Sequence, residues 1–149
     1  MEREFAVRIR SVRSSDFPLI ARLSDQLGYP TSPGAAERRL KSLLQDDHHA
    51  AFVVESSGGE GIGWVHVFGT HRLEADPFAE IGGLIVEESC RGKGAGRSLL
   101  QAAEDWARER GYPVVRVRSN VIRENTHRFY RKMGYRTLKT QKVYGKDLG

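Results

Sequence analysis

The sequence predicts a mixed α/β protein in which helices pack against a central sheet, within one domain over residues 1–149. Three observations support this prediction. Short stretches that alternate apolar and polar residues, as strands do, recur along the chain. Between them lie stretches whose apolar residues recur every three or four positions, as on one face of a helix. No repeat, low-complexity segment or linker separates these elements.

The first half of the chain is predicted to form a strand, two helices and a hairpin. FAVRIRSV, residues 5–12, alternates apolar and charged residues as a half-buried strand does. SSD, residues 14–16, offers N-cap chemistry for a helix that runs to Leu27. A second helix is predicted over residues 33–44, with leucines on one face. AAFVVE and GWVHVF, residues 50–55 and 63–68, form a hairpin around SSGGEG.

The second half is predicted to form a strand, a long helix and several shorter elements. AEIGGLIV, residues 79–86, is a more apolar strand, and a glycine-rich loop follows it. The helix after this loop ends at Gly111, and its apolar positions are Leu99, Leu100, Ala103, Trp106 and Ala107. A strand over residues 114–119 and a short helix over residues 125–133 come next. The tail, residues 135–148, is predicted to form one or two late strands.

Composition narrows the class of protein. The chain is 39% hydrophobic and 29% charged, as in folded, water-soluble proteins. No apolar run is long enough to cross a bilayer, and MEREFAVRIR at the start lacks the apolar segment of a secretory signal. The single cysteine, Cys90, excludes an intramolecular disulfide and fits a reducing compartment. We therefore expect a cytoplasmic protein that is not bound to a membrane.

The positive charge is concentrated in the last third. The net charge is +5, and from Arg108 onward the chain holds 12 Lys and Arg against 3 Asp and Glu. Such a block favours an anionic partner, such as a nucleic acid, an acidic protein or a phosphorylated small molecule, or it serves solubility alone. No nucleic-acid-binding motif accompanies it, so nucleic acid is the least favoured partner.

The stretch RGKGAGRS, Arg91 to Ser98, lies between the apolar strand and the long helix. A helix N-terminus presents unpaired N–H groups and partial positive charge, and glycine lets an anion approach the backbone. These features together predict a phosphate-binding loop, although an ordinary glycine-rich turn has the same composition. The dinucleotide pattern G-x-G-x-x-G fails at Arg97, and the P-loop pattern fails because arginine follows Gly96.

Two motifs resemble the GNAT superfamily of acetyl-CoA-dependent N-acetyltransferases. LIVEESCRGKGAGRSLLQAAEDWARERGY matches the family's apolar strand, R-G-x-G-x-G loop and long helix. SNVIRENTHRFYRKMGY, residues 119–135, matches its later strand, short helix, aromatic-tyrosine pair and glycine turn. The resemblance covers nearly the whole chain. It implies a mixed, mostly antiparallel, twisted sheet of six to seven strands with about four flanking helices.

The resemblance also implies which residues bind acetyl-CoA. Main-chain groups of Leu84, Ile85 and Val86 would pair with the pantetheine arm as an added strand does, and Gly82 and Gly83 would form a bulge or a simple twist just before them. The pyrophosphate would lie against a set of loop residues: Arg91, Gly92, Lys93, Gly94, Ala95, Gly96 and Arg97. Arg123 stands where many relatives carry an asparagine that contacts the coenzyme.

Two residues match positions that carry chemistry in the family. Tyr130 aligns with a tyrosine near the coenzyme sulfur, where a neutral phenol can donate a proton to the thiolate; otherwise it packs beside Phe129. Glu80 lies six residues before Val86, at the offset of the catalytic glutamate in the histone-acetylating branch; otherwise it pairs with an arginine. Many relatives carry an acidic residue where this chain has Gly82, so direct attack by an already neutral amine remains an alternative to a base.

These residues predict N-acetyl transfer from acetyl-CoA to a primary amine by direct attack in a ternary complex. A small-molecule acceptor, such as an amino sugar, an aminoglycoside-like compound or a polyamine, is favoured over a protein or peptide amine. A non-catalytic acyl-CoA sensor is the other alternative. Tyr29, Ser119 and Asn120 are the expected acceptor-binding residues. With one cysteine and no cluster at ligand spacing we expect no metal, and the family leaves a homodimer open.

Overall fold

The computed structural model describes residues 6–118 and 124–149. By its internal contacts the chain divides into two compact units, Met1–Val117 and Arg118–Gly149, and each is described by itself. The first unit holds the sheet and three helices, and the second holds α4, Glu124–Lys132. In the described parts of the chain, no helix is long and apolar enough to cross a membrane.

The first unit is built on a sheet with strand order β1-β2-β3-β4-β5. The strands are β1 Val7–Ser11, β2 His49–Ser56, β3 Gly61–Thr70, β4 Phe78–Val86 and β5 Val115–Val117. Neighbours from β1 to β4 are antiparallel, and β5 runs parallel to β4. The mixed, mostly antiparallel sheet, with four α-helices among the described residues, confirms the predicted fold class. The expected six to seven strands are wrong, because the described residues form five.

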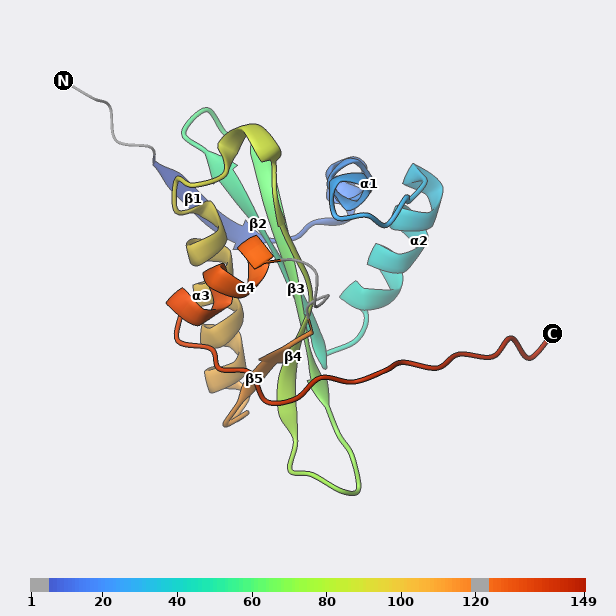
Figure 1. Ribbon diagram of the computed structural model, residues 1–149. Coiled ribbons are helices and arrows are strands. Elements are labelled where there is room, and N and C mark those ends of the chain that lie inside the picture. The colour runs from blue at the N-terminus through green and yellow to red at the C-terminus, as the bar shows by residue number, and fades with distance from the viewer. Residues whose placement is uncertain (1–5, 119–123) are drawn as a thin grey trace. The chain divides into compact units, whose positions relative to one another are not determined.

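Helices cover both faces of this sheet (Figure 1). On one face lie α1, Phe17–Gln26, and α2, Pro33–Leu44; on the other lies α3, Ala95–Glu109. A 3₁₀ turn, Ser14–Asp16, precedes α1, so the predicted cap residues form a turn of their own. A second 3₁₀ turn, Glu88–Cys90, lies between β4 and α3.

The alternation of strand residues explains the two layers. Val53 of β2 packs with Leu40 of α2, and Trp64 of β3 packs with Leu23 of α1. We call this side of the sheet the α1–α2 face. On the opposite face α3 buries the five apolar positions predicted from its spacing: Leu99, Leu100, Ala103, Trp106 and Ala107.

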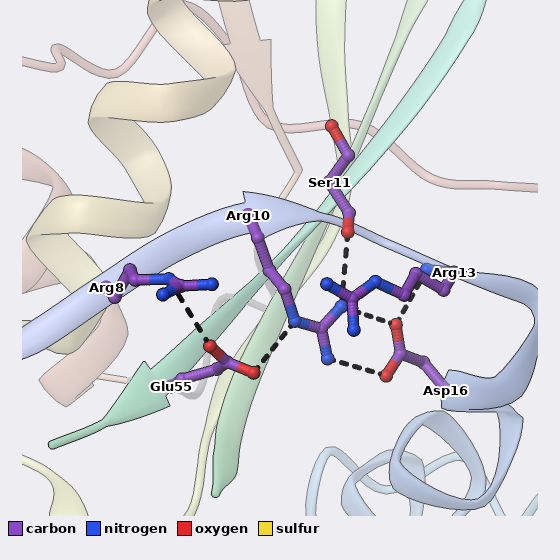
Figure 2. Close-up of polar contacts among 6 residues, drawn as sticks. All are labelled: Arg8, Arg10, Ser11, Arg13, Asp16 and Glu55. Atoms are coloured by element: carbon purple, nitrogen blue, oxygen red, sulfur yellow. Dashed lines mark hydrogen bonds and ion pairs between the residues drawn. The ribbon is translucent and has the colours of Figure 1, made fainter. Parts of the chain in front are cut away.

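An ion-pair network joins the edge strand β1 to β2 and to the 3₁₀ turn Ser14–Asp16 (Figure 2). The Arg10 guanidinium on β1 donates to both carboxylate oxygens of Asp16 at 2.8 Å and to Glu55 of β2 at 2.9 Å. Asp16 also accepts the Arg13 backbone N–H at 2.7 Å. Burial acts to raise the pKa of Asp16, but its hydrogen bonds with Arg10 and the Arg13 N–H outweigh this and lower that pKa. The hydrogen bond from Arg10 likewise lowers the pKa of Glu55 against a smaller opposing effect of burial. The network ties β1, β2 and the 3₁₀ turn together.

The second unit corrects the prediction for the tail. Residues 135–149 contain no helix or strand, so the late strands expected over residues 135–148 are wrong. Leu138, Val143 and Tyr144 are exposed there. Alternating residues are compatible with a strand, but a strand needs a hydrogen-bonded partner, and the described residues of this unit contain no other strand.

Candidate active site

The glycine loop leads into α3 through left-handed backbone. Gly92 and Gly94 have φ of 80° and 89°, and Gly94 is the N-cap of α3. An L side chain at Gly94 would be strained, because only glycine adopts this φ without a steric cost. No side chain caps the helix and no acidic residue lies in its first turn. The first N–H groups of α3, from Ala95 to Arg97, therefore have no acceptor within the helix and form a site for an anion.

Three cations surround this helix end. The side chains of Arg91, Lys93 and Arg97 are all exposed. Arg91 also braces the loop, because its Nε donates to the Val86 carbonyl at 3.0 Å. The positive charge therefore lies at the rim of the loop, where it adds to the partial charge of the helix end.

The second half of β4 has a strand neighbour on one side only, within the part of the chain that the structure describes. Leu84, Ile85 and Val86 pair with β3, whereas β5 pairs only with Ala79–Ile81. Main-chain groups that point away from β3 in this segment line an open sheet edge next to the glycine loop. Such an edge can pair with an extended ligand that carries amide groups.

A β-bulge separates the two halves of β4. His66 pairs with Gly83 and Val67 pairs with Ile81, so Gly82 is an extra residue on β4. A Cβ at Gly82 would lie 2.6 Å from His66 Nδ1, and a Cβ at Gly83 would lie 2.8 Å from the Trp64 ring. Neither position has room for a side chain unless the ring moves. Of the two alternatives for the glycine pair, a bulge and a simple twist, the structure has the bulge.

Glu80 lies on β4 just before this bulge, and it is half-buried. Its register neighbours are Phe68 on β3 and Arg116 on β5. Paired residues point to the same side of a sheet, so Glu80 shares the α1–α2 face with His66 and Phe68. The Arg116 guanidinium stacks over the Phe78 ring, 4.0 Å from its centroid, and brings positive charge to this face.

Two histidines on this face form a pair that the sequence did not reveal. His49 Nδ1 and His66 Nε2 are 2.9 Å apart, and the two rings are stacked with centroids 5.1 Å apart. Burial, and then the neighbouring His49, lower the pKa of His66 to about 4, so His66 is uncharged at pH 7. The sequence predicts the hairpin of residues 50–55 and 63–68 but not how its strands pair. Its register would have revealed the pair, because Ala51 is opposite His66 and His49 is two residues away on the same face.

Tyr130 lies in the second unit, on α4. Its ring makes edge-to-face contacts with Phe129 and Tyr135, with centroids 5.1 and 5.6 Å away. Gly134, with φ of 93°, ends the helix so that the Tyr135 N–H reaches the Tyr130 carbonyl at 2.9 Å. Burial raises the pKa of Tyr130 to about 12, so the phenol keeps its proton at neutral pH.

The remaining predicted residues have different outcomes. Tyr29 is exposed in the connection from α1 to α2. That connection begins near the bulge, because Leu27 approaches within 3.9 Å of the Cβ position of Gly83. Ser119, Asn120 and Arg123 lie outside the described residues. No cluster of three or more His, Cys, Asp or Glu side chains suited to a metal occurs among the residues that are described.

Side chains near the end of α1 form an ion pair and hydrogen bonds with the residues just before the glycine loop. Arg22 forms an ion pair with Glu87, which lowers the pKa of that carboxyl. Gln26 donates to Glu87 at 3.4 Å and accepts the Glu88 backbone N–H at 3.1 Å. These contacts connect the α1–α2 face to the segment that precedes the glycine loop.

Comparison with known proteins relates this arrangement to a family. The model of the Acetyltransferase (GNAT) family matches residues 9–135. The uncharacterized N-acetyltransferase YhdJ of Bacillus subtilis is 45% identical over 125 residues, which cover 82% of this chain and 83% of that protein. The aminoglycoside N(6')-acetyltransferase type 1 of Stenotrophomonas maltophilia is 29% identical over 135 residues, which cover 87% and 86%.

A solved structure has the same fold. Aminoglycoside N-acetyltransferase AAC(6')-Iy in complex with CoA superposes with a TM-score of 0.86 at 20% identity, over 98% of each chain. At this identity the superposition supports the fold. That neighbouring structure contains CoA.

Proposed function

The chain belongs to the GNAT family of acetyltransferases, and from this premise we propose that it transfers the acetyl group of acetyl-CoA to a primary amine of a small molecule. An amino sugar, an aminoglycoside-like compound or a polyamine is the proposed acceptor class. The relative named as an aminoglycoside N-acetyltransferase, similar over most of both chains, supports this choice. We further propose that the two units belong to one catalytic domain and that the enzyme works in the cytoplasm.

The observation that carries the proposal is the uncapped start of α3. Gly94 enters the helix at a φ of 89°, so the first N–H groups are available to an anion, and no acidic residue opposes one. These donors, with the cations Arg91, Lys93 and Arg97 at the rim, would hold the coenzyme pyrophosphate. Arg123 is the further coenzyme contact that the resemblance adds.

The open edge of β4 supports the placement of the pantetheine arm. Leu84, Ile85 and Val86 would pair with its amide groups as with an added strand. This edge runs from the glycine loop to the bulge at Gly82, so the thioester would lie at the bulge. The α1–α2 face beside the bulge would then receive the amine, with Tyr29, Ser119 and Asn120 as contacts.

During the reaction the nitrogen of an ammonium ion loses two protons, and the sulfur of the leaving thiolate gains one. The amine attacks the thioester carbonyl, a C–N bond forms and the C–S bond breaks. Glu80 is the proposed base, on the face that would receive the amine. Tyr130 is the proposed acid from the resemblance, and its pKa of about 12 means that the phenol carries a proton at neutral pH. Direct attack requires no covalent acetyl-enzyme.

A thiol-release assay tests the proposal. The protein is incubated with acetyl-CoA and a panel of amino sugars, aminoglycosides, polyamines and amino-terminal peptides. We expect CoA release with at least one small amine and an acetylated product of matching mass. Release with peptides alone would reject the small-molecule class. Calorimetric binding of acetyl-CoA without release on any amine would indicate a sensor instead, and absence of binding would refute the loop assignment.

A further inference from the structure

Three side chains form a chain of contacts that ends at the bulge of β4, and two of them, His49 and His66, lie on the α1–α2 face. Asp46, just before β2, has Oδ2 3.7 Å from His49 Nε2. His49 Nδ1 lies 2.9 Å from His66 Nε2. The remaining ring nitrogen, His66 Nδ1, faces the bulge, where a Cβ on Gly82 would come within 2.6 Å of it. Gly82 is exposed, so a ligand can reach the bulge.

The negative charge of Asp46, 3.7 Å from His49 Nε2, favours one arrangement of protons on the two histidines. A carboxylate only accepts, so Asp46 favours the form of His49 that carries its proton on Nε2. The Nδ1 of neutral His49 is then an acceptor, and His66 Nε2 must donate to it. Neutral His66 consequently keeps a lone pair on Nδ1, directed at the bulge.

We propose that His66 accepts a proton from the bound ammonium form of the amine, and that His49 and Asp46 draw this proton away from the site. This inference rests on the proposed function and adds an acceptor besides Glu80 for the two protons that the nitrogen loses. The bond changes balance without any other reactant. The ammonium proton passes to His66 Nδ1, the His66 Nε2 proton passes to His49 Nδ1, and the positive charge comes to rest on His49 beside the Asp46 carboxylate.

The low pKa of His66 is consistent with a residue that passes a proton on rather than one that keeps it. Burial and the adjacent ring make a charge on His66 unfavourable, so the proton does not stay there. His49 Nε2 lies 3.7 Å from Asp46 Oδ2, so a charge on His49 has a carboxylate beside it. From the other strands, Glu80 of β4 and Arg116 of β5 share this face by register, and Arg72 stacks over Phe78 at 5.4 Å.

A pair of matched variants separates this role from packing. His66→Phe keeps an aromatic ring beside Phe68 but removes both nitrogens. His71→Phe is the control, because His71 follows the same hairpin yet contacts Tyr112. We expect His66→Phe to lower kcat about tenfold to a hundredfold near pH 7, with unchanged acetyl-CoA affinity. The loss should shrink above about pH 9, where amines lose their proton to water. His49→Phe should give a smaller loss of the same pH dependence.

The outcomes distinguish this inference from the proposed function. A wild-type protein that is inactive on every amine contradicts the proposed function and with it this role of His66. An active wild type whose pH profile coincides with that of His66→Phe overturns only the role of His66. If His66→Phe does not fold, long-range ¹H–¹⁵N NMR spectra of the histidine rings in the wild type test the same proposal. We expect both His49 and His66 protonated on Nε2 at pH 7; a proton on His66 Nδ1 would overturn the proposal.

Discussion

Asp16→Asn removes the central carboxylate of the network in Figure 2 while keeping the shape of the side chain. In the wild type this carboxylate accepts two Arg10 N–H groups at 2.8 Å and the Arg13 N–H at 2.7 Å. The Arg10 and Asp16 side chains are only 14% and 11% exposed, so water replaces these bonds poorly. Exposed ion pairs contribute up to about 1 kcal/mol, and loss of one partner of a buried pair costs about 3–5 kcal/mol.

This network lies between those two limits, so we expect a loss of about 2 kcal/mol in the free energy of unfolding at pH 7. For a chain of this length that corresponds to a fall of about 4–8 °C in Tm. The pKa of Asp16 is lowered from its ordinary value of 3.8, so its contribution is complete above that value. It disappears as the pH falls through the lower, folded-state pKa, because the protonated carboxyl can no longer pair with Arg10.

Urea unfolding at a series of pH values measures this effect. The control is Asp76→Asn, since Asp76 is exposed on the loop before β4. Equal stability of wild type and Asp16→Asn at pH 7 would refute the reasoning. So would a difference that persists unchanged in strong acid, because it would show that the carboxylate charge is not the cause.

Three variants test the proposed site. Gly94→Val should weaken acetyl-CoA binding at least tenfold by calorimetry with the fold retained, because a β-branched residue strains a φ of 89°; normal affinity would remove the loop from the coenzyme site. Glu80→Gln should lower kcat/KM and shift the acidic limb of the rate–pH profile, and an unmoved limb would dismiss Glu80 as a base. Tyr130→Phe should lower kcat about tenfold or more with little change in acetyl-CoA affinity, and unchanged turnover would exclude the phenol as the acid.

Much of the fold could be predicted because its elements are locally encoded. The helix predicted over residues 33–44 has those bounds, since Ser32 caps it and Pro33 starts it. The long helix buries its five predicted apolar residues. The prediction of strands in the tail failed because strand pairing depends on a distant partner that no local pattern specifies. The strand predicted over residues 114–119 is Val115–Val117 in the structure, where it pairs with β4, and Ser119 lies outside the described residues.

In the site, too, features with a contiguous sequence pattern were predicted, and features that depend on strand register were not. A glycine loop before a helix is a contiguous pattern, and the structure has the left-handed Gly94 that this pattern favours. The bulge at Gly82 was one of two alternatives for a glycine pair, and only the register with β3 decides between them. The His49–His66 contact joins residues 17 positions apart, and it depends on register and on ring orientation together.

The contacts of Arg22 and Gln26 with Glu87 and Glu88 have a thermodynamic consequence. A ligand that orders the start of the glycine loop also restrains the last turns of α1. Because linkage is reciprocal, whatever stabilises those turns strengthens binding at the loop by the same factor. Protection of the α1 amides against hydrogen exchange is therefore a remote reporter of loop occupancy. Under the proposed function, acetyl-CoA at the loop and an amine beside α1 would therefore strengthen each other's binding.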